Sequence, residues 1–509
     1  MADAKREIER KYESDDSGLP DLTGVGGVAA ILDKGVVELD ATYHDTADER
    51  LAAASITLRR RTGGSDAGWH LKFPLGPGVR EEIHAPLSDS LPEELAALVR
   101  SRVRDAELIP VVRLRSARDL RHLVDATGRL LAEASVDAVT AERLTEGGGT
   151  AQWTEIEVEL AEDVDPVVLD KVEKRLRKAG VRPSKAPSKL ARALADTAPA
   201  AKKARRGPKK PAKPAKPAEP VTAGDHILAY VRDQRDAIVE LDPAVRRDVE
   251  DSVHKMRVAT RRMRSTFRSF GKVLDRTVTD PIGVELKWLA AELGVDRDRE
   301  VLTERLTAAL DAVPGELVSG PVHERLRLWA GASHGGARGR VIGVLDSQRY
   351  LTLLDTLDAL VADPPLLEAA AGTPEKVIAK AVRKDFAKVA GLVEQALDLD
   401  PGHARDLGLH EARKKAKRAR YAAEAATPAL GDPAAALTKD MKSLQTLLGD
   451  HQDSVMARQT LRELAAVAHA AGESAFTYGL LYGREEQGAA AVEAELPGVW
   501  KGMRSGASV

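Results

Sequence analysis

The chain has 509 residues, of which 43% are apolar, 31% charged and 3% aromatic. This length suggests roughly two to four globular domains, whose cores must be built mainly from Ala, Leu and Val. The sequence contains no cysteine, which excludes disulfides, thiolate metal sites and cysteine nucleophiles. The net charge of −2 combines 77 basic with 79 acidic residues, so local clusters decide what the protein binds.

The N-terminus and the hydropathy of the chain bear on its location. The first residues, MADAKREIERKYE, lack the apolar stretch of a secretory signal. No segment approaches the roughly 20 consecutive apolar residues that span a bilayer. We therefore expect a cytoplasmic protein without a membrane partner.

Residues 1–197 are predicted to form an antiparallel α+β domain. The segment 55–61 places Thr57, Arg59 and Arg61 on one face of a strand, and the segment 155–160 alternates Glu with Ile, Val and Leu. Glycine pairs and triplets near residues 63 and 147 separate such segments. Shorter helices are expected at 91–102 and 166–179.

Acidic residues alternate along two of these strands. Glu7, Glu9 and Lys11 share a strand face, and the segment 155–159 presents a second acidic face. Carboxylates on one face repel one another unless a charge neutralises them, and Mg²⁺ or Mn²⁺ prefers such oxygen ligands. Two acidic strands that face each other in a barrel would form a metal site. A solvated strand face is the alternative for either motif by itself.

Basic residues alternate along other predicted strands of the same domain. Arg59 and Arg61 share one face, Lys72 lies in the strand-like segment 70–73, and Arg113 and Arg115 alternate in 111–115. Arginine forks and lysine ammonium groups bind phosphate oxygens, whereas carboxylates bind the metal. A barrel with acidic and basic inward faces therefore suits a metal–polyphosphate complex.

The segment 198–221 is predicted to be a linker. Its central part, AKKARRGPKKPAKPAKPAEP, combines proline with many Lys and Arg residues. Proline disfavours helix and like charges repel, so we expect an extended tether. Attraction of a polyanion to its charge is the alternative role.

Residues 222–500 are predicted to form an all-α bundle with an internal repeat. Long segments rich in Ala, Leu, Arg and Glu are expected to break near Pro243, Pro281, Pro314, Pro364-Pro365, Pro401 and Pro433. The segment 254–264, HKMRVATRRMR, matches 410–420, HEARKKAKRAR. A Leu-Gly pair and an Asp four residues beyond it follow each copy at nearly equal spacing. Two motifs in the same order imply two structurally equivalent halves.

Each copy of this repeat places four basic residues on one side of a helix. At about 100° per residue, His254, Arg257, Arg261 and Arg264 form a narrow stripe. His410, Arg413, Lys417 and Arg420 form its counterpart. We call these eight residues the repeat stripe. Two such stripes that face each other favour a positive groove over a solvated basic surface.

The N-terminal motifs occur in an order that resembles the CYTH family over about residues 1–195. These motifs are Glu7-x-Glu9-x-Lys11, Tyr43-His-Asp45 with Leu51, Leu58-Arg59-x-Arg61, Lys72, Glu155-Ile-Glu157-Val-Glu159-Leu and Ser188-Lys189-Leu. The resemblance implies an eight-stranded antiparallel tunnel barrel that acts on triphosphate groups with Mg²⁺ or Mn²⁺. It assigns metal binding to Glu7, Glu9, Glu157 and Glu159. It assigns phosphate binding to Arg59, Arg61, Lys72, Arg115, Lys189 and Lys11, with Arg113 and Arg118 as second choices. Lys11 is the expected general base if neighbouring cations lower its pKa.

The C-terminal repeats resemble the CHAD family, a helical bundle that binds inorganic polyphosphate. This resemblance covers about residues 222–500 and assigns polyphosphate binding to His254, Arg257, Arg261, Arg264, Lys287, His410, Arg413, Lys417, Arg420 and Lys442. Metal binding by the two motif histidines is disfavoured, since no carboxylates accompany them at ligand spacing. Nucleic acid is a weaker candidate partner than polyphosphate, because few aromatic residues lie near the stripe for base stacking.

Three functions remain open at this point. The first is a metal-dependent inorganic triphosphatase whose helical domain binds inorganic polyphosphate. The second is a non-catalytic protein that associates with polyphosphate granules, because the stretch 134–139 holds just Asp137 where relatives carry an acidic cluster. The third is a nucleotide cyclase or thiamine-triphosphatase, for which no motif identifies an adenine or thiamine pocket.

Overall fold

The computed structural model describes residues 3–14, 18–145, 147–199, 220–294, 297–331 and 337–506. The chain divides into two compact units, Met1–Lys213 and Pro214–Val509. Most of the predicted linker, residues 200–219, lies outside the described residues. None of the helices in the described ranges is both long and apolar enough to cross a membrane.

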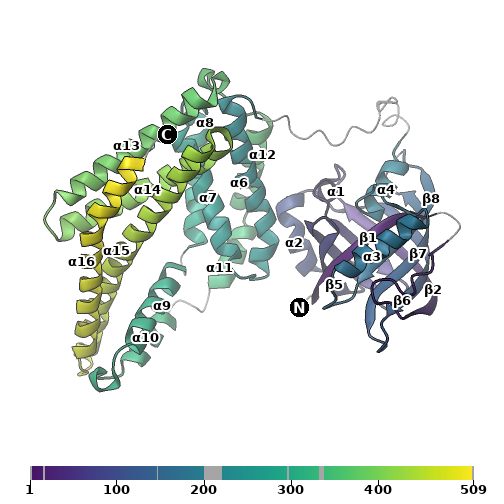
Figure 1. Ribbon diagram of the computed structural model, residues 1–509, viewed down its shortest axis with the longest axis horizontal. Coiled ribbons are helices and arrows are strands. Elements are labelled where there is room, and N and C mark those ends of the chain that lie inside the picture. The colour runs from purple at the N-terminus through teal and green to yellow at the C-terminus, as the bar shows by residue number, and fades with distance from the viewer. Residues whose placement is uncertain are drawn as a thin grey trace. The chain divides into compact units, whose positions relative to one another are not determined.

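The first unit is a closed antiparallel sheet (Figure 1). Its strands are β1 (Asp3–Ser14), β2 (Ala30–Asp45), β3 (Thr57–Thr62), β4 (Gly68–Gly76), β5 (Val79–Pro86), β6 (Ile109–Val124), β7 (Leu130–Arg143), β8 (Thr150–Leu160) and β9 (Arg182–Pro183). They follow the order β5-β4-β3-β2-β6-β7-β8-β1-β9, and pairing of β5 with β1 closes a ring of the first eight strands. This confirms the predicted eight-stranded tunnel barrel.

Within the described part of this unit, four helices accompany the barrel. They are α1 (Arg50–Ala53), α2 (Glu93–Val103), α3 (Val167–Lys178) and α4 (Lys189–Asp196). Helices α2 and α3 correspond to the two helices predicted from the sequence. Leu190 of α4 belongs to the same buried apolar cluster as Leu114, Val139 and Trp153, which point inward from β6, β7 and β8. This apolar cluster fills one part of the barrel interior and leaves the rest to charged side chains.

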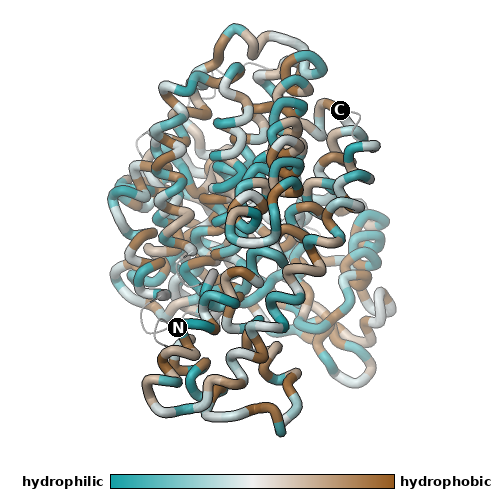
Figure 2. Tube along the Cα trace, turned by 90° about the vertical axis from the view of Figure 1, so that its left-hand side faces the viewer, coloured by the Kyte–Doolittle hydropathy of each residue, from teal (hydrophilic) through white to brown (hydrophobic). Residues whose placement is uncertain are grey.

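The second unit is helical, as predicted. Its elements are α6 (Ala223–Arg246), α7 (Ser252–Ser269), α8 (Arg276–Glu292), α9 (Arg297–Asp311), η1 (Gly315–Leu317), α10 (Val322–Gly331), α11 (Ala337–Asp346), α12 (Gln348–Ala362), η2 (Glu368–Ala371), α13 (Pro374–Leu397), α14 (His403–Leu430), α15 (Asp432–Ala470) and α16 (Phe476–Gly506). Hydrophilic and hydrophobic residues alternate along the helices (Figure 2). This amphipathic pattern lets each helix bury one side.

Two of the expected helix breaks were wrong in detail. Pro243 lies inside α6, three residues before its end, and Pro281 lies inside α8, near its start. Each proline removes one backbone hydrogen bond and places its ring against the carbonyl four residues earlier, and the packing of the rest of the helix offsets this cost. By contrast, Pro401 lies between α13 and α14, and Pro433 lies in the first turn of α15.

The internal repeat corresponds to two pairs of helices. The two copies of the His motif lie on α7 and α14, and the Leu-Gly motifs lie at the end of α8 and within α15. Arg262 of α7 pairs with Glu424 of α14 at 2.5 Å, whereas Arg418 bonds to the backbone carbonyl of Arg268 at 2.6 Å. The later residue of α7 thus contacts the earlier residue of α14, so the two helices run antiparallel.

Candidate functional sites

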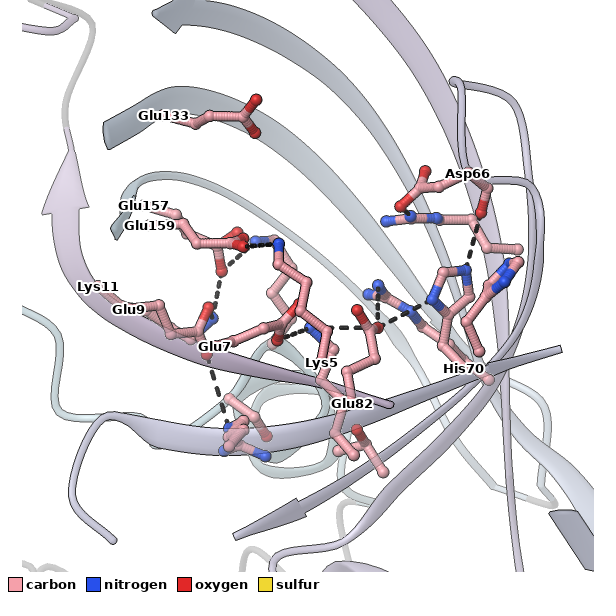
Figure 3. Close-up of a pocket in the computed structure, with 18 of the residues that line it drawn as sticks. Lys5, Glu7, Glu9, Lys11, Asp66, His70, Glu82, Glu133, Glu157 and Glu159 are labelled. Atoms are coloured by element: carbon pink, nitrogen blue, oxygen red, sulfur yellow. Dashed lines mark hydrogen bonds and ion pairs between the residues drawn. The ribbon is translucent and has the colours of Figure 1, made fainter. Parts of the chain in front are cut away.

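The barrel of the first unit encloses a charged cavity of about 350 Å³ (Figure 3). Its cationic lining residues are Lys5, Lys11, Arg59, Arg61, Lys72, Arg80, Arg118 and Lys189. Its carboxylates are Glu7, Glu9, Asp66, Glu82, Glu133, Glu157 and Glu159. Most come from alternate positions of neighbouring strands, because strand side chains on one face recur every second residue.

The acidic motifs predicted on separate strands face each other in the cavity. Glu9 lies opposite Glu159 and Lys11 opposite Glu157 in the β1–β8 register. Lys11 Nζ lies 2.9 Å from Glu9 and also pairs with Glu157, and Lys72 pairs with Glu7. The carboxylates are therefore neutralised by the protein's own cations, despite their crowding.

A second group of carboxylates lies deeper, on β7 and β8. Ligand atoms of Asp137, Glu155 and Glu157 all lie within 4.8 Å of one another. Lys189 Nζ contacts these three residues at 2.9, 2.8 and 2.5 Å. Glu133, also on β7, lines the cavity as well, so the acidic lining is richer than the sequence stretch 134–139 indicated. Oxygen donors alone suit a hard divalent cation.

The buried arginines of β3 lie in a strongly cationic part of the cavity. Burial, together with Arg59 and Arg118, lowers the pKa of Arg61 to about 9. Arg61 pairs with Asp66 of the β3–β4 turn. Arg59 donates to the Tyr43 hydroxyl at 3.3 Å. A phosphate group placed among these guanidinium groups would relieve their mutual repulsion.

Lys11 is held as an ammonium group. Although burial opposes it, the neighbouring Glu157 and Glu9 raise the pKa of Lys11 above its ordinary value. The expected role of general base required a lowered pKa. In this arrangement Lys11 donates hydrogen bonds to the carboxylates of Glu9 and Glu157.

Arg115 and Arg118 of β6 lie on opposite faces of the barrel wall. Arg115 was expected to bind phosphate, but its side chain is 58% exposed and does not line the cavity. Arg118 lines the cavity and contacts Asp137 at 2.7 Å and Glu157 at 2.8 Å. Side chains alternate between the two faces of a strand, so Arg118, four residues after the buried Leu114, points to the same face as Leu114. Arg115, one residue after Leu114, points to the opposite face.

Several lining residues were missed in the sequence analysis. His70 contacts Glu82 at 2.8 Å and the Asp66 carbonyl at 2.9 Å through its two ring nitrogens. Burial lowers the pKa of His70 to about 4, so its ring is neutral. Lys5 and Arg80 also face the cavity. Lys5 lies two residues from Glu7 on β1, and Arg80 lies two residues from Glu82 on β5, so each shares a strand face with a cavity carboxylate. This spacing was the signal in the sequence that could have revealed them.

In the helical unit, each repeat glycine lies against a repeat arginine. A side-chain carbon placed on Gly294 would come within 2.3 Å of Arg257 Nη2, and one placed on Gly449 would come within 3.4 Å of Arg413 Nη2. Arg257 is 6% exposed. In the first copy, the glycine therefore makes space for the arginine of the His motif, whereas in the second copy a side-chain carbon would fit beside Arg413.

Other residues of the repeat stripe lie in different surroundings. Arg261, Arg264, Lys417 and Arg420 are half-buried, and Lys287 and Lys442 are exposed. The Arg420 guanidinium lies 4.7 Å from the Tyr421 ring, and His410 Nδ1 lies 2.6 Å from Gln452. His254 lines a separate hollow that also contains Asp248, Glu250, Asp251, Glu292 and Glu300. That end of the stripe is therefore acidic.

A histidine–carboxylate cluster lies elsewhere in the helical unit. His451 Nε2 is 3.1 Å from Glu493 and 3.4 Å from Asp406. Arg405 pairs with Glu493 at 2.8 Å, and Arg458 lies 3.5 Å from Asp406. The arginines already compensate both carboxylates, so we interpret the cluster as a structural ion-pair network.

Fold and sites together define a two-domain protein, an antiparallel tunnel with a charged cavity followed by a helical domain with a repeated basic motif. The CYTH domain model matches residues 5–194, and the CHAD domain model matches residues 229–462. The chain belongs to the family of proteins that join these two domains. Uncharacterised proteins from two strains of Mycobacterium tuberculosis are 40% identical over 499 residues, covering 94% of this chain and 92% of theirs.

Solved structures similar to parts of the chain include bacterial and plant proteins. PptA from Streptomyces chartreusis is 22% identical with a TM-score of 0.48, covering 55% of this chain and 99% of that one. The CHAD domain from the plant Ricinus communis is 24% identical with a TM-score of 0.42, covering 57% and 92%. A putative adenylyl cyclase from Hippeastrum, described as having a dominant triphosphatase activity, is 20% identical with a TM-score of 0.24, covering 38% and 96%.

Proposed function

We propose that the tunnel domain hydrolyses inorganic triphosphate and short polyphosphate with Mg²⁺ or Mn²⁺, and that the helical domain binds inorganic polyphosphate. The observation that carries the proposal is the tunnel lining, in which eight Lys and Arg residues surround carboxylates on facing strands. Apart from two histidines, Tyr43 is the one aromatic residue in this lining, and its hydroxyl bonds to Arg59. The lining offers phosphate binding without an evident wall for a nucleobase or thiamine.

The donor set of the cavity fits a hard divalent cation. We propose Glu7, Glu9, Glu157 and Glu159 as its ligands, with Asp137 behind them. When bound, such a cation would neutralise phosphate charge and acidify a coordinated water. Strand pairing fixes these carboxylates before substrate arrives, so little reorganisation is needed on binding.

The cations of the chain would bind and orient the phosphate groups. Arg59, Arg61 and Lys72 project from β3 and β4, and Arg118 and Lys189 approach from β6 and α4. Guanidinium forks can bind two oxygens at once, whereas lysines act as point charges. Charge that develops on the transferred phosphoryl group would be stabilised by the same side chains.

Phosphate release from tripolyphosphate tests the hydrolase. Glu9→Gln removes one cavity carboxylate charge and should abolish Mn²⁺-dependent release. Glu38→Gln is the matched control, because Glu38 is an exposed residue of β2 outside the cavity. Equal activity in the two variants, or an inactive wild type, would contradict the proposed site.

A non-catalytic polyphosphate-binding protein remains the second candidate. The observation that favours it is that a metal ion must compete with Lys11, Lys72 and Lys189 for the cavity carboxylates. In that case, tripolyphosphate would bind to the wild type without phosphate release at any metal concentration.

Polyphosphate binding by the helical domain has its own test. Arg261→Ala combined with Lys417→Ala removes equivalent charges from both copies of the repeat stripe. Affinity for long-chain polyphosphate should fall, and binding should weaken steeply with salt, because bound counterions are released. Unchanged affinity in this variant would refute the role of the stripe.

A further inference from the structure

A basic pocket lies where the C-terminal end of α7 meets α8, α13 and α14. Its volume is about 370 Å³. Its lining is Arg268, Ser269, Arg276, Lys384, Asp385, Lys388 and Arg418. We call it the α7-end pocket. Five of these seven residues are cationic, and none belongs to the repeat stripe, although Arg418 lies beside the stripe in the second copy of the motif.

The single carboxylate of the pocket is used within the protein. Asp385 is 3% exposed, accepts a hydrogen bond from Ser269 Oγ at 2.6 Å and pairs with Arg418 Nε at 3.0 Å. Arg418 is thereby fixed in place, with a further bond to the Arg268 carbonyl. Lys388 Nζ lies 3.5 Å from the other oxygen of Asp385. Arg276 pairs with Asp280, which lies outside the lining. Even with Asp280 counted, cations outnumber carboxylates by three.

Helix α13 brings a column of lysines to this pocket. Lys376, Lys380, Lys384 and Lys388 follow one another at intervals of four residues, and all four are exposed. Like charges at this spacing lie near each other on a helix and repel. A solvated face would tolerate them singly, but four in a column that ends in a cationic hollow indicate an anionic partner.

The pocket also continues the repeat stripe. Arg268 follows Arg264 by four residues on α7, so the two lie on the same side of the helix. Burial lowers the pKa of Arg264, and the nearby charges of Arg268 and Arg261 lower it further. A chain of anionic groups bound along the stripe could therefore continue into the pocket and remain next to cationic side chains throughout.

In the second copy of the repeat, an acidic residue occupies the position that is equivalent to Arg268. Arg268 and Glu424 occupy the same position relative to the motif histidines of their repeats. Glu424 pairs with Arg262 at 2.5 Å and accepts a hydrogen bond from Tyr230 at 3.3 Å. The two halves thus differ in charge at equivalent positions, and one end favours an anion more than the other.

We propose that the α7-end pocket is an additional phosphate subsite, which holds further phosphate groups of an inorganic polyphosphate chain bound on the repeat stripe. The inference rests on the proposed polyphosphate binding of the helical domain and adds a location and a direction to it. The chain would continue past Arg268 toward Lys384 and Lys388. It would not continue in the same way past Glu424.

The test is a double variant, Lys384→Ala with Lys388→Ala, in the full chain. Both lysines are exposed on a helix, and alanine is the best helix former. Asp385 loses the Lys388 contact at 3.5 Å but keeps its bonds to Ser269 and Arg418, so the fold should persist. The matched control is Lys171→Ala with Lys174→Ala, which removes two exposed charges from α3 of the tunnel domain. Affinity for long-chain inorganic polyphosphate is measured by calorimetry at several salt concentrations.

The pocket variant should bind the long chain at least about tenfold more weakly than the control. The slope of log affinity against log salt should fall by about two, one for each cation removed. A pocket variant that matches the control would overturn the subsite. The Arg261→Ala and Lys417→Ala variant would then show whether the proposed function itself survives. Tighter wild-type binding of single-stranded DNA than of polyphosphate would also overturn the proposal.

Discussion

The opposite orientations of Arg115 and Arg118 give the sharpest test of the tunnel. Arg118→Ala removes a side chain that lines the cavity and contacts Asp137 and Glu157. In the proposed hydrolase, a charged hydrogen bond from Arg118 to a phosphate oxygen would contribute about 1.5–3 kcal/mol, which corresponds to roughly 10- to 150-fold in kcat/KM. Arg115→Ala removes an exposed arginine that lies 3.8 Å from Asp40, a type of surface pair that contributes about 0–1 kcal/mol.

The assay is steady-state phosphate release from tripolyphosphate, with thermal unfolding of each variant measured alongside. Asp137 keeps its contact with Lys189 at 2.9 Å after the substitution, so its buried charge still has a partner. Arg118→Lys should give an intermediate rate, because lysine keeps the charge but loses the fork. A loss in Arg115→Ala as large as that in Arg118→Ala would refute the inward orientation of Arg118.

Three further predictions follow from individual contacts. Gly294→Ala should destabilise the helical unit by about 1–3 kcal/mol, because its added carbon displaces Arg257. Gly449→Ala should be neutral or stabilising by up to about 1 kcal/mol, because Gly449 lies within a helix and an added carbon would be at an ordinary distance from Arg413. Urea unfolding followed by helical circular dichroism measures both changes. Burial raises the pKa of Glu7 from 4.5 to about 7, so its contribution to stability is present below pH 4.5 and is lost as pH rises through about 7. In EDTA, the free energy of unfolding of the wild type relative to that of Glu7→Gln should therefore fall over that range. The comparison is made with the variant because the lowered pKa of His70 acts in the opposite direction and stabilises the tunnel unit as pH rises from about 4 to 6.5. EDTA should also abolish phosphate release but leave polyphosphate binding by the helical unit intact, and loss of both would contradict the separation of the two sites.

Strand periodicity correctly predicted the tunnel lining where the alternation of residue types shows which side chains share a face. Glu7, Glu9, Arg59 and Arg61 were placed on inward faces because unambiguous alternation surrounds them. Arg115 was misplaced because alternating arginines on β6 do not by themselves reveal which face is buried. Leu114 supplies that information only once its burial against Leu190 of α4 is known.

Helical periodicity predicted the repeat stripe but not the surroundings of each residue. A stripe at 100° per residue treats Arg257 and Arg261 alike. The glycine that accommodates Arg257 comes from another helix and was noted only as a motif. Likewise, the acids around His254 and the lysines of α13 approach through tertiary contacts, which no local pattern contains.

The balance of charge differs between the two candidate phosphate sites. The tunnel lining contains eight cationic and seven acidic side chains, so its net charge is small. Such a lining suits phosphate that arrives together with a divalent cation, since the metal adds the positive charge that the protein lacks. The α7-end pocket has an excess of cations and its one carboxylate is engaged by Arg418, so it suits the bare polyanion. On this reasoning, the metal requirement belongs to the tunnel, and salt sensitivity belongs chiefly to the helical domain.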